Sequence, residues 1–200
     1  MIKVYHAPRT RSIRILWLLE ELGVPYAIER VAFAPAPAPF AQATPFGKVP
    51  ALEDGDVTMF ESGAMVEYLL ERYGRGRLAP AIGSAERAPF LQWLHFSEST
   101  AFNLIGTVVW LVLYRKDADQ NAALIADAKA RAAVGLDFLE RHLGDSEFVL
   151  PSGFSAADIM LGFTLSAARA FGILDDRLTR LNAYSKRLEA RPALQKALTL

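Results

Sequence analysis

The pair Glu61-Ser62 is the part of this sequence best suited to hold a charged ligand. Ser62 is the first residue of a helix that the pattern predicts to run to about Tyr73. A hydroxyl at a helix start and the backbone amides after it point at an anion, and the positive end of the helix dipole favours negative charge there. A carboxylate fits this position. As a bare dipeptide, however, Glu-Ser before a helix is more commonly a simple N-cap.

A second feature is the step Val49-Pro50 at the head of a predicted strand. Proline in that position removes one backbone donor and permits a cis peptide bond, which leaves the backbone of the preceding residue open. An extended peptide can therefore pair with Val49. The alternative is an ordinary turn proline, which is the commoner case when such a step is considered alone.

The residues that the chain lacks limit its chemistry. The sequence of 200 residues contains no cysteine, which excludes disulfides, thiolate metal sites and any reaction that uses a protein thiol. If thiol chemistry occurs, the ligand must supply the sulfur. The three histidines, His6, His95 and His142, show no helical ligand spacing, so no metal site is expected. No Gly-x-Ser-x-Gly motif accompanies them, which disfavours histidine-based hydrolysis.

Composition indicates an ordinary globular protein. Hydrophobic residues make up 52% of the chain, enough to bury the core of one large domain or two small ones. The 22 basic and 22 acidic residues cancel and are scattered, so neither nucleic acid nor an anionic membrane is expected as a partner. The start lacks the apolar core of a signal peptide, and the longest apolar stretch, near Leu104 to Tyr114, is shorter than the roughly 18 residues of a membrane span. A soluble cytoplasmic protein is the expectation.

Strand and helix signals alternate in the first part of the chain. They predict strands at 2–6, 26–31, 49–52 and 57–60, and helices at 12–22 and from 62 to about 73. The helix at 12–22 is apolar on all sides, so it should be covered on more than one side. The Ala-Pro repeats of 34–39 predict a surface loop. This order, with a βαβ unit first and a hairpin last, is typical of a thioredoxin-like domain.

The second part of the chain shows helical periodicity. Helices are predicted at about 86–114, 121–143, 155–171 and 174–190, with Ser155 and Asp158 forming a structural capping box. The residues between the two parts are rich in glycine and proline. We therefore predict an α/β thioredoxin-like domain at 1–78, a linker at 79–86 and an all-α helical bundle domain at 87–200.

Three segments resemble signatures of the cytosolic glutathione transferase family, with features of its theta and beta classes. They are RILWLLEELG (14–23), TPFGKVPAL (44–52) and FESGA (60–64), in the family's order and spacing. The helical part is similar more loosely, through WLHF (93–96) and FSAAD (154–158). The resemblance implies a thioredoxin-like domain that binds glutathione, followed by a helical domain, and no metal.

The resemblance also assigns residues to glutathione. Val49, before a proline that is cis in the family, would hydrogen-bond the cysteinyl backbone of glutathione as an added β-strand. Ser62 would take the γ-glutamyl carboxylate and Glu61 the ammonium group. Lys48 would lie near the glycyl end. Pro50 completes the predicted glutathione-binding set.

The residue that stabilises the thiolate is to be sought in the loop after the first strand. A glutathione thiol should titrate near the free cysteine pKa of about 8.5, so a hydroxyl donor, a helix N-terminus or a cation must stabilise its ionised form. Four residues before Arg14, which resembles the arginine after the theta-class serine, stands Thr10. Thr10 is the first candidate. Ser12 is the second, although a helix cap is its simpler role.

Other groups near this loop remain alternatives. Tyr5 could donate a phenolic proton, as in the classes that use tyrosine, but it stands inside the predicted strand. His6 is more commonly a packed strand residue than a base. Arg9 and Arg11 could lower the pKa of the thiol, whereas exposed loop arginines are usually just solvated. Backbone amides and bound water could also stabilise the thiolate.

The resemblance further implies where a second substrate binds. In the family, the first long helix of the second domain faces the thiol, and here it carries His95, Phe102, Trp110 and Tyr114 as candidate electrophile-pocket residues, each of which could equally be helix core. The implied activity is attack of glutathione on a small hydrophobic electrophile or an organic peroxide. The alternative is a non-catalytic ligand carrier or regulatory protein. A homodimer is expected, with Met65, Tyr68 and Leu69 offering apolar surface.

Overall fold

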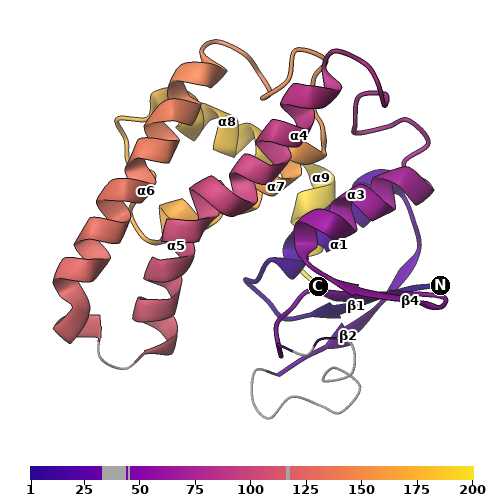
Figure 1. Cartoon of the computed structure of the whole chain (residues 1–200), viewed down its shortest axis with the longest axis horizontal. Coiled ribbons are helices and arrows are strands. Elements are labelled where there is room, and N and C mark those ends of the chain that lie inside the picture. Colours follow the sequence, from indigo (N-terminus) through magenta and orange to yellow (C-terminus); the bar gives the residue numbers. More distant parts are fainter. Residues whose placement is uncertain (33–43, 45, 116–117) are drawn as a thin grey trace. The chain divides into compact units, whose positions relative to one another are not determined.

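The protein folds into two compact units, and its computed structural model describes residues 1–32, 44, 46–115 and 118–200 (Figure 1). The first unit consists of Met1–Ala79 together with Ala190–Leu200, and the second of Pro80–Glu189. The predicted fold class is confirmed, because the first unit holds a mixed sheet with helices and the described part of the second is helical. The domain boundaries at 78 and 87 stay a prediction, to which the structure adds that the C-terminal segment belongs with the first unit.

Four strands form one sheet in the order β2-β1-β3-β4. β1 is parallel to β2 and antiparallel to β3, and β3 is antiparallel to β4. The strands are Ile2–His6 (β1), Tyr26–Arg30 (β2), Ala51–Asp54 (β3) and Val57–Phe60 (β4). β3 begins two residues later than predicted because its register with β1 starts where Ala51 pairs with Tyr5. Val49 and Pro50 therefore lie just outside the ladder. The predicted loop at 34–39 lies outside the described residues.

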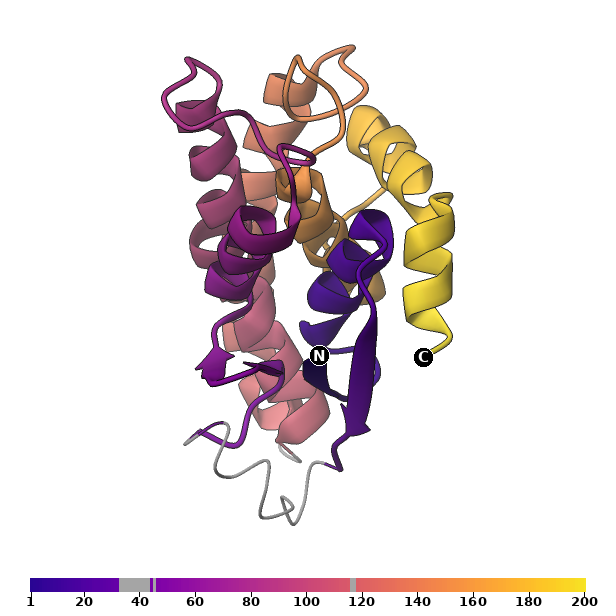
Figure 2. The ribbon, with the colours of Figure 1, turned by 90° about the vertical axis from the view of Figure 1, so that its right-hand side faces the viewer.

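Helix α1, Ser12–Leu22, is covered on opposite sides, as its apolar sequence predicted. The run from Ile15 to Leu19 is fully buried, with every side chain at 0% exposure. Figure 2 shows α1 between α3 and α9, and it also contacts β1. Gly23 ends the helix at φ 65°, a conformation that glycine adopts without a Cβ clash.

Helix α9, Pro192–Leu198, is a separate element that the sequence pattern did not predict. Ion pairs join it to α1. The Arg191 guanidinium contacts the Glu21 carboxylate through Nε at 2.6 Å and Nη2 at 2.9 Å, and Lys196 Nζ lies 2.8 Å from Glu20 Oε2. These contacts explain why the end of the chain belongs to the first unit.

Helix α3, Ser62–Tyr73, begins and ends where predicted. Its apolar residues do not form the surface that the sequence suggested for a partner subunit. Met65 and Leu69 are both 0% exposed because they pack into the core of their own unit. Tyr68 is half-buried, and its hydroxyl donates to Asp54 Oδ2 at 2.9 Å. The expectation that Met65 and Leu69 present apolar surface was therefore wrong.

The second unit begins with a long helical run that confirms the helix predicted at 86–114. The run contains α4, η1, α5 and η2, of which η1 and η2 are π-helical, and α6, α7 and α8 follow. Their bounds are Arg87–His95 (α4), Phe96–Ala101 (η1), Phe102–Val109 (α5), Trp110–Tyr114 (η2), Ala122–Leu143 (α6), Ala156–Ala170 (α7) and Thr179–Glu189 (α8). A short 3₁₀ turn, Ala118–Asn121, precedes α6.

The start of α8 differs from the predicted helix start at Leu174. The Asp175 carboxylate accepts the backbone N–H of Arg177 at 2.9 Å and the Arg177 guanidinium at 2.8 and 3.0 Å. The Asp175 side chain thus binds a backbone N–H in a local turn. Aspartate side chains commonly compete with helix formation in this way. Helix α8 therefore begins only at Thr179.

One helix of the described chain, Arg87–Tyr114, is long and apolar enough by length and composition to cross a membrane. Core helices of soluble proteins meet the same criteria. Within the second unit, this helix contacts α6 and α7, and its residues Ile105 and Val108 are fully buried. Its apolar character is thus partly accounted for by packing inside the unit.

Candidate functional site

The first unit contains a pocket where the start of α3 meets the segment before β3. Three stretches far apart in sequence line it: the loop before α1, the residues preceding β3, and the end of β4 with the first turn of α3. The lining residues are Arg11, Thr44, Phe46, Lys48, Val49, Pro50, Phe60, Glu61 and Ser62. All five residues predicted for the peptide ligand are therefore brought together. Thr44, Phe46 and Phe60 belong to the quoted motifs, but had no predicted role.

The Val49-Pro50 peptide bond is cis. Val49 is 9% exposed and Pro50 is buried, so this step forms a wall of the pocket beside the sheet. The ladder with β1 begins only at Ala51. The backbone of Val49 consequently lies at the entrance to the ladder, where an extended ligand can add to it.

Ser62 lies at the N-terminus of α3 and is 3% exposed. Its Oγ accepts a hydrogen bond from Arg14 Nη1 at 3.1 Å, and Arg14 is itself 0% exposed. Because a guanidinium only donates, this bond fixes the hydroxyl oxygen at the helix start. The sequence showed Arg14 as part of a motif, but not this contact, since only the fold brings α1 beside the start of α3.

Glu61 immediately precedes α3 and has an unusual backbone conformation. Its φ of 73° is positive, which is uncommon for a residue with a side chain and costs on the order of 1–3 kcal/mol. Its carbonyl accepts the Met65 N–H at 3.0 Å, whereas its exposed side chain makes no helix-capping bond. Glu61 thus lines the pocket without capping the helix.

The charges around the pocket have both signs. Arg11 and Lys48 contribute cations, Glu61 contributes an anion, and the N-terminus of α3 adds a partial positive charge. The rings of Phe46 and Phe60 meet edge to face at 5.6 Å and supply apolar surface. A ligand with two carboxylates and one ammonium group would find an opposite charge for each.

The candidate hydroxyls lie in the loop beside this pocket. Thr10 Oγ1 donates to the Ala7 carbonyl at 2.7 Å and lies 2.7 Å from Ser12 Oγ. Ser12 is 0% exposed, and its Oγ lies 2.8 Å from His6 Nδ1. Among the described residues that line the pocket, neither Thr10 nor Ser12 is included, whereas their neighbour Arg11 is. Thr10 is half-buried and its hydroxyl donates to Ala7, so its donation to a ligand would replace that hydrogen bond.

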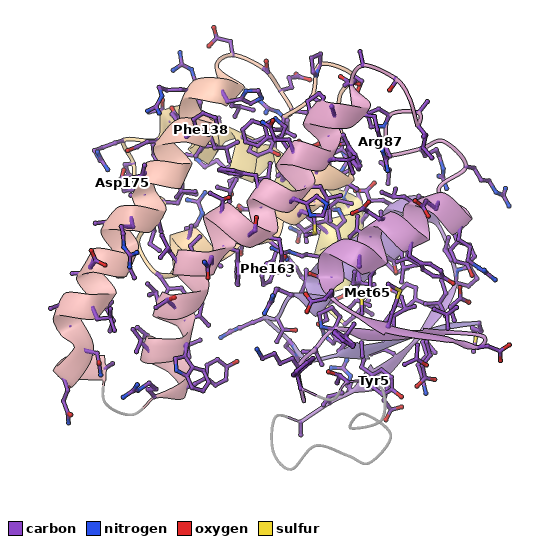
Figure 3. All side chains as sticks on the ribbon, in the orientation of Figure 1. Tyr5, Met65, Arg87, Phe138, Phe163 and Asp175 are labelled. Carbon is purple, nitrogen blue, oxygen red and sulfur yellow. The ribbon has the colours of Figure 1, made fainter. Side chains whose placement is uncertain are left out.

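Tyr5 is held inside the unit (Figure 3). Its hydroxyl donates to the Glu53 carboxylate, which also pairs with Lys3 Nζ at 2.8 Å. Burial and the hydrogen bond to Glu53 raise the pKa of the Tyr5 phenol above its ordinary value. Tyr5 is therefore poorly placed to donate to a ligand.

The residues predicted for a second substrate are spread along the helix Arg87–Tyr114 of the second unit. Trp110 and Tyr114 stack at 5.7 Å, and they are 57% and 50% exposed. Phe102 instead contacts Phe163 of α7 at 5.6 Å. His95 is exposed at the end of α4, on the order of 20 Å from Trp110 at about 1.5 Å of rise per residue. Trp110 and Tyr114 therefore form a stacked, exposed pair near the end of this helix.

No group of three or more histidine, aspartate and glutamate side chains that could hold a metal ion occurs in the part of the chain that the structure describes.

Family models match most of the chain. The model of the glutathione S-transferase N-terminal domain matches residues 1–71, and the model of the glutathione S-transferase C-terminal domain matches residues 122–187. The first match contains every residue of the pocket.

Individual proteins are similar over nearly the whole chain. Glutathione S-transferase 3 of Schizosaccharomyces pombe is 30% identical, over 96% of this chain and 85% of that protein. Glutathione S-transferase F7 of Arabidopsis thaliana is 28% identical, over 98% of this chain and 99% of its own. A crystal structure of a glutathione transferase family member from Pseudomonas fluorescens, with two glutathione bound, is 26% identical with a TM-score of 0.86, covering 98% of this chain and 92% of that one.

Proposed function

This chain belongs to the cytosolic glutathione S-transferase family, and we propose that it binds glutathione in the pocket at the start of α3. The observation that carries the proposal is the convergence of Lys48, Val49, Pro50, Glu61 and Ser62 on that pocket. Glutathione carries two carboxylates, one ammonium group and an extended peptide backbone. The pocket offers a partner for each of these features.

Each part of glutathione has a proposed partner. The γ-glutamyl carboxylate lies at Ser62 and the first amides of α3, where helix dipole and hydroxyl both favour an anion. Its ammonium group pairs with Glu61. The cysteinyl backbone adds to Val49 as a short β-strand, and the glycyl carboxylate lies near Lys48. This orientation directs the sulfur toward the loop that carries Thr10 and Arg11.

The proposed reaction is nucleophilic attack by the glutathione thiolate. The thiol loses its proton to solvent, and the sulfur electron pair then forms a bond to an electrophilic carbon while the leaving group departs with its own electron pair. Arg11 lowers the pKa of the thiol electrostatically, and Thr10 donates a hydrogen bond to the ionised sulfur. The exposed pair Trp110 and Tyr114 supplies apolar surface for a hydrophobic electrophile. An organic peroxide is a second class of electrophile for the same thiolate.

A glutathione titration followed by calorimetry, with a conjugation assay on a reactive chloroaromatic, tests the proposal. We expect saturable binding and release of chloride with formation of the thioether. A variant in which Glu61 and Ser62 are replaced should lose glutathione binding and conjugation in parallel. A folded parent protein that shows no heat of binding would refute the proposal.

A non-catalytic glutathione carrier is the second candidate function. It is favoured by one observation: the hydroxyls of Tyr5, Thr10 and Ser12 all have hydrogen-bond partners within the first unit. Binding of glutathione without turnover of several electrophiles would select the carrier. A cytoplasmic location and a homodimeric state remain part of the proposal for either function.

A further inference from the structure

Three side chains at the end of β1 and the start of α1 form a continuous hydrogen-bonded chain. His6 Nδ1 lies 2.8 Å from Ser12 Oγ, Ser12 Oγ lies 2.7 Å from Thr10 Oγ1, and Thr10 Oγ1 lies 2.7 Å from the Ala7 carbonyl oxygen. His6 and Ser12 are 1% and 0% exposed. Thr10, at the other end, is half-buried. The chain therefore runs from a buried imidazole to the residue proposed to contact sulfur.

The number of protons determines the direction of this chain. Three contacts of 2.7 to 2.8 Å each need one hydrogen between their heavy atoms. The two hydroxyls of Thr10 and Ser12 supply one proton each. The third can come only from His6, so Nδ1 must carry a hydrogen. With that hydrogen in place, His6 donates to Ser12, Ser12 donates to Thr10, and Thr10 donates to Ala7.

The opposite direction leaves one contact without a hydrogen. If Nδ1 were unprotonated, Ser12 would donate to His6 and Thr10 would donate to Ser12. Thr10 Oγ1 and the Ala7 oxygen would then face each other at 2.7 Å with no proton between them. Two oxygen lone pairs at that distance repel, so the geometry excludes this arrangement.

We propose that His6 and Ser12 are positioning residues that orient the Thr10 hydroxyl as the last donor of a directed hydrogen-bond chain, an inference that rests on the proposed function. Successive donors in such a chain polarise one another, which strengthens the last donor. When a thiolate binds, Thr10 transfers its donation from Ala7 to sulfur. Ser12 has a single hydroxyl proton and keeps it on Thr10 Oγ1, although its Oγ also lies 3.2 Å from the Ala7 carbonyl oxygen.

The surroundings of His6 keep the ring neutral, as the chain requires. Burial, followed by the positive charge of Arg30, lowers the pKa of the His6 imidazole below its ordinary value. At neutral pH the ring therefore carries one proton, and the hydrogen-bond chain places it on Nδ1. The backbone carbonyl of His6 accepts the Val31 N–H at 2.9 Å, which helps to hold the end of β1 in place.

The tautomer can be measured on the parent protein without any substitution. Because the sequence has only three histidines, nitrogen NMR of protein labelled at histidine gives few signals, and His6 is assigned by the signal lost in His6→Asn. We expect the hydrogen on Nδ1, both in the free protein and with glutathione bound. A His6 ring protonated on Nε2 alone would overturn the inference.

The effect on sulfur is measured as the pKa of the bound thiol, followed by ultraviolet absorbance of the thiolate. Ser12→Ala and His6→Leu both interrupt the chain, so the pKa should rise by about one unit, a tenfold loss of thiolate near neutral pH. His6→Asn, whose amide can donate from the place of Nδ1, should stay within about 0.3 units of the parent value. His142→Asn in the second unit is the matched control and should not shift the pKa.

The outcomes separate this inference from the proposed function. A Ser12→Ala protein that binds glutathione with an unchanged thiol pKa overturns the chain while the proposed function stands. If the thiol pKa in His6→Asn rises as much as it does in His6→Leu, the donor role of the imidazole is overturned. If the parent itself binds no glutathione in the calorimeter, the proposed function fails, and the role of the chain at sulfur fails with it.

Discussion

At the scale of single residues, the contact between Arg14 and Ser62 links ligand binding to the core. The Ser62 hydroxyl lies in the pocket, but it also accepts from a guanidinium that is fully buried. Removing it would affect two partners at once, namely a ligand carboxylate and a buried cation. Charged groups that lose a hydrogen-bond partner in the interior are costly, which ties binding and stability together here.

We predict that Ser62→Ala weakens glutathione binding at least tenfold. The expected loss is that of a charge-assisted hydrogen bond, about 1.5 to 3 kcal/mol. Titration calorimetry measures this loss, and urea unfolding should show a smaller free energy of unfolding because Arg14 loses the Ser62 hydroxyl as an acceptor. Lys48→Ala, at an exposed position of the pocket, serves as a comparison that weakens binding without that loss of stability. Parent-like affinity in folded Ser62→Ala would mean that the site is misplaced.

Thr10→Val tests the proposed donor to sulfur with little change in shape. The bound thiol should lose a hydrogen bond and its pKa should rise, so the conjugation rate at neutral pH should fall by about tenfold to several hundredfold. Glutathione affinity, for which we propose Val49, Glu61 and Ser62 as the main contacts, should change much less. A pH-rate profile indistinguishable from that of the parent would instead assign the thiolate to Arg11, backbone amides or water.

Sequence motifs predicted five residues that the structure brings together in one pocket, but not the contacts that support them. Glu61 and Ser62 are adjacent in a recognisable signal, and Val49-Pro50 is another. The sequence identified Arg14 only as part of a motif and His6 only as a strand residue, and it did not predict their hydrogen-bond partners. Their partners lie across the fold or across a loop, and no local spacing encodes which polar atoms meet inside a core.

At the scale of elements, the start of α7 is fixed by one buried carboxylate. Asp158 is 0% exposed and accepts from Ser155 N at 2.8 Å, Ser155 Oγ at 2.9 Å, Val149 N at 3.0 Å and the Tyr184 hydroxyl at 2.7 Å. The capping box predicted from Ser155 and Asp158 is confirmed. Besides capping α7, this carboxylate connects the helix to α8 through Tyr184 and to the preceding loop through Val149.

Asp158→Ala should therefore destabilise the protein severely. Four buried donors would lose their acceptor, for an expected loss of about 3 to 5 kcal/mol in the free energy of unfolding. Urea unfolding followed by circular dichroism measures it. Asp127→Ala is the matched control, since Asp127 forms an exposed i,i+4 pair with Arg131 and its replacement should change stability by less than about 0.5 kcal/mol. Similar losses in both variants would contradict the account of α7.

Periodicity predicted most elements because their patterns are local. Strand β1 and helices α1 and α3 have the predicted bounds, with Gly23 marking the end of α1. The start of α8 and the existence of α9 were missed. The first depends on the side chain of Asp175, and the second is a short helix whose place is set by ion pairs with α1, a helix far away in sequence.

At the scale of the whole molecule, we predict a twofold homodimer. Met65 and Leu69 cannot form its surface because they are buried within one chain, but each unit still exposes large apolar side chains. Phe46 is 66% exposed in the first unit, and Leu113 is 64% exposed in the second. Light scattering should give a mass about twice 22.0 kDa at micromolar concentration. A single species at 22.0 kDa would contradict the dimer.

We propose that glutathione lies in the pocket at the start of α3 with its sulfur at the Thr10 loop, and a crystal structure of the glutathione complex would show both features at once. We expect the γ-glutamyl carboxylate within hydrogen-bond distance of Ser62 Oγ, the cysteinyl backbone paired with Val49, and the sulfur within about 3.5 Å of Thr10 Oγ1. Glutathione bound away from Glu61 and Ser62, or bound there with its sulfur turned from Thr10, would contradict it.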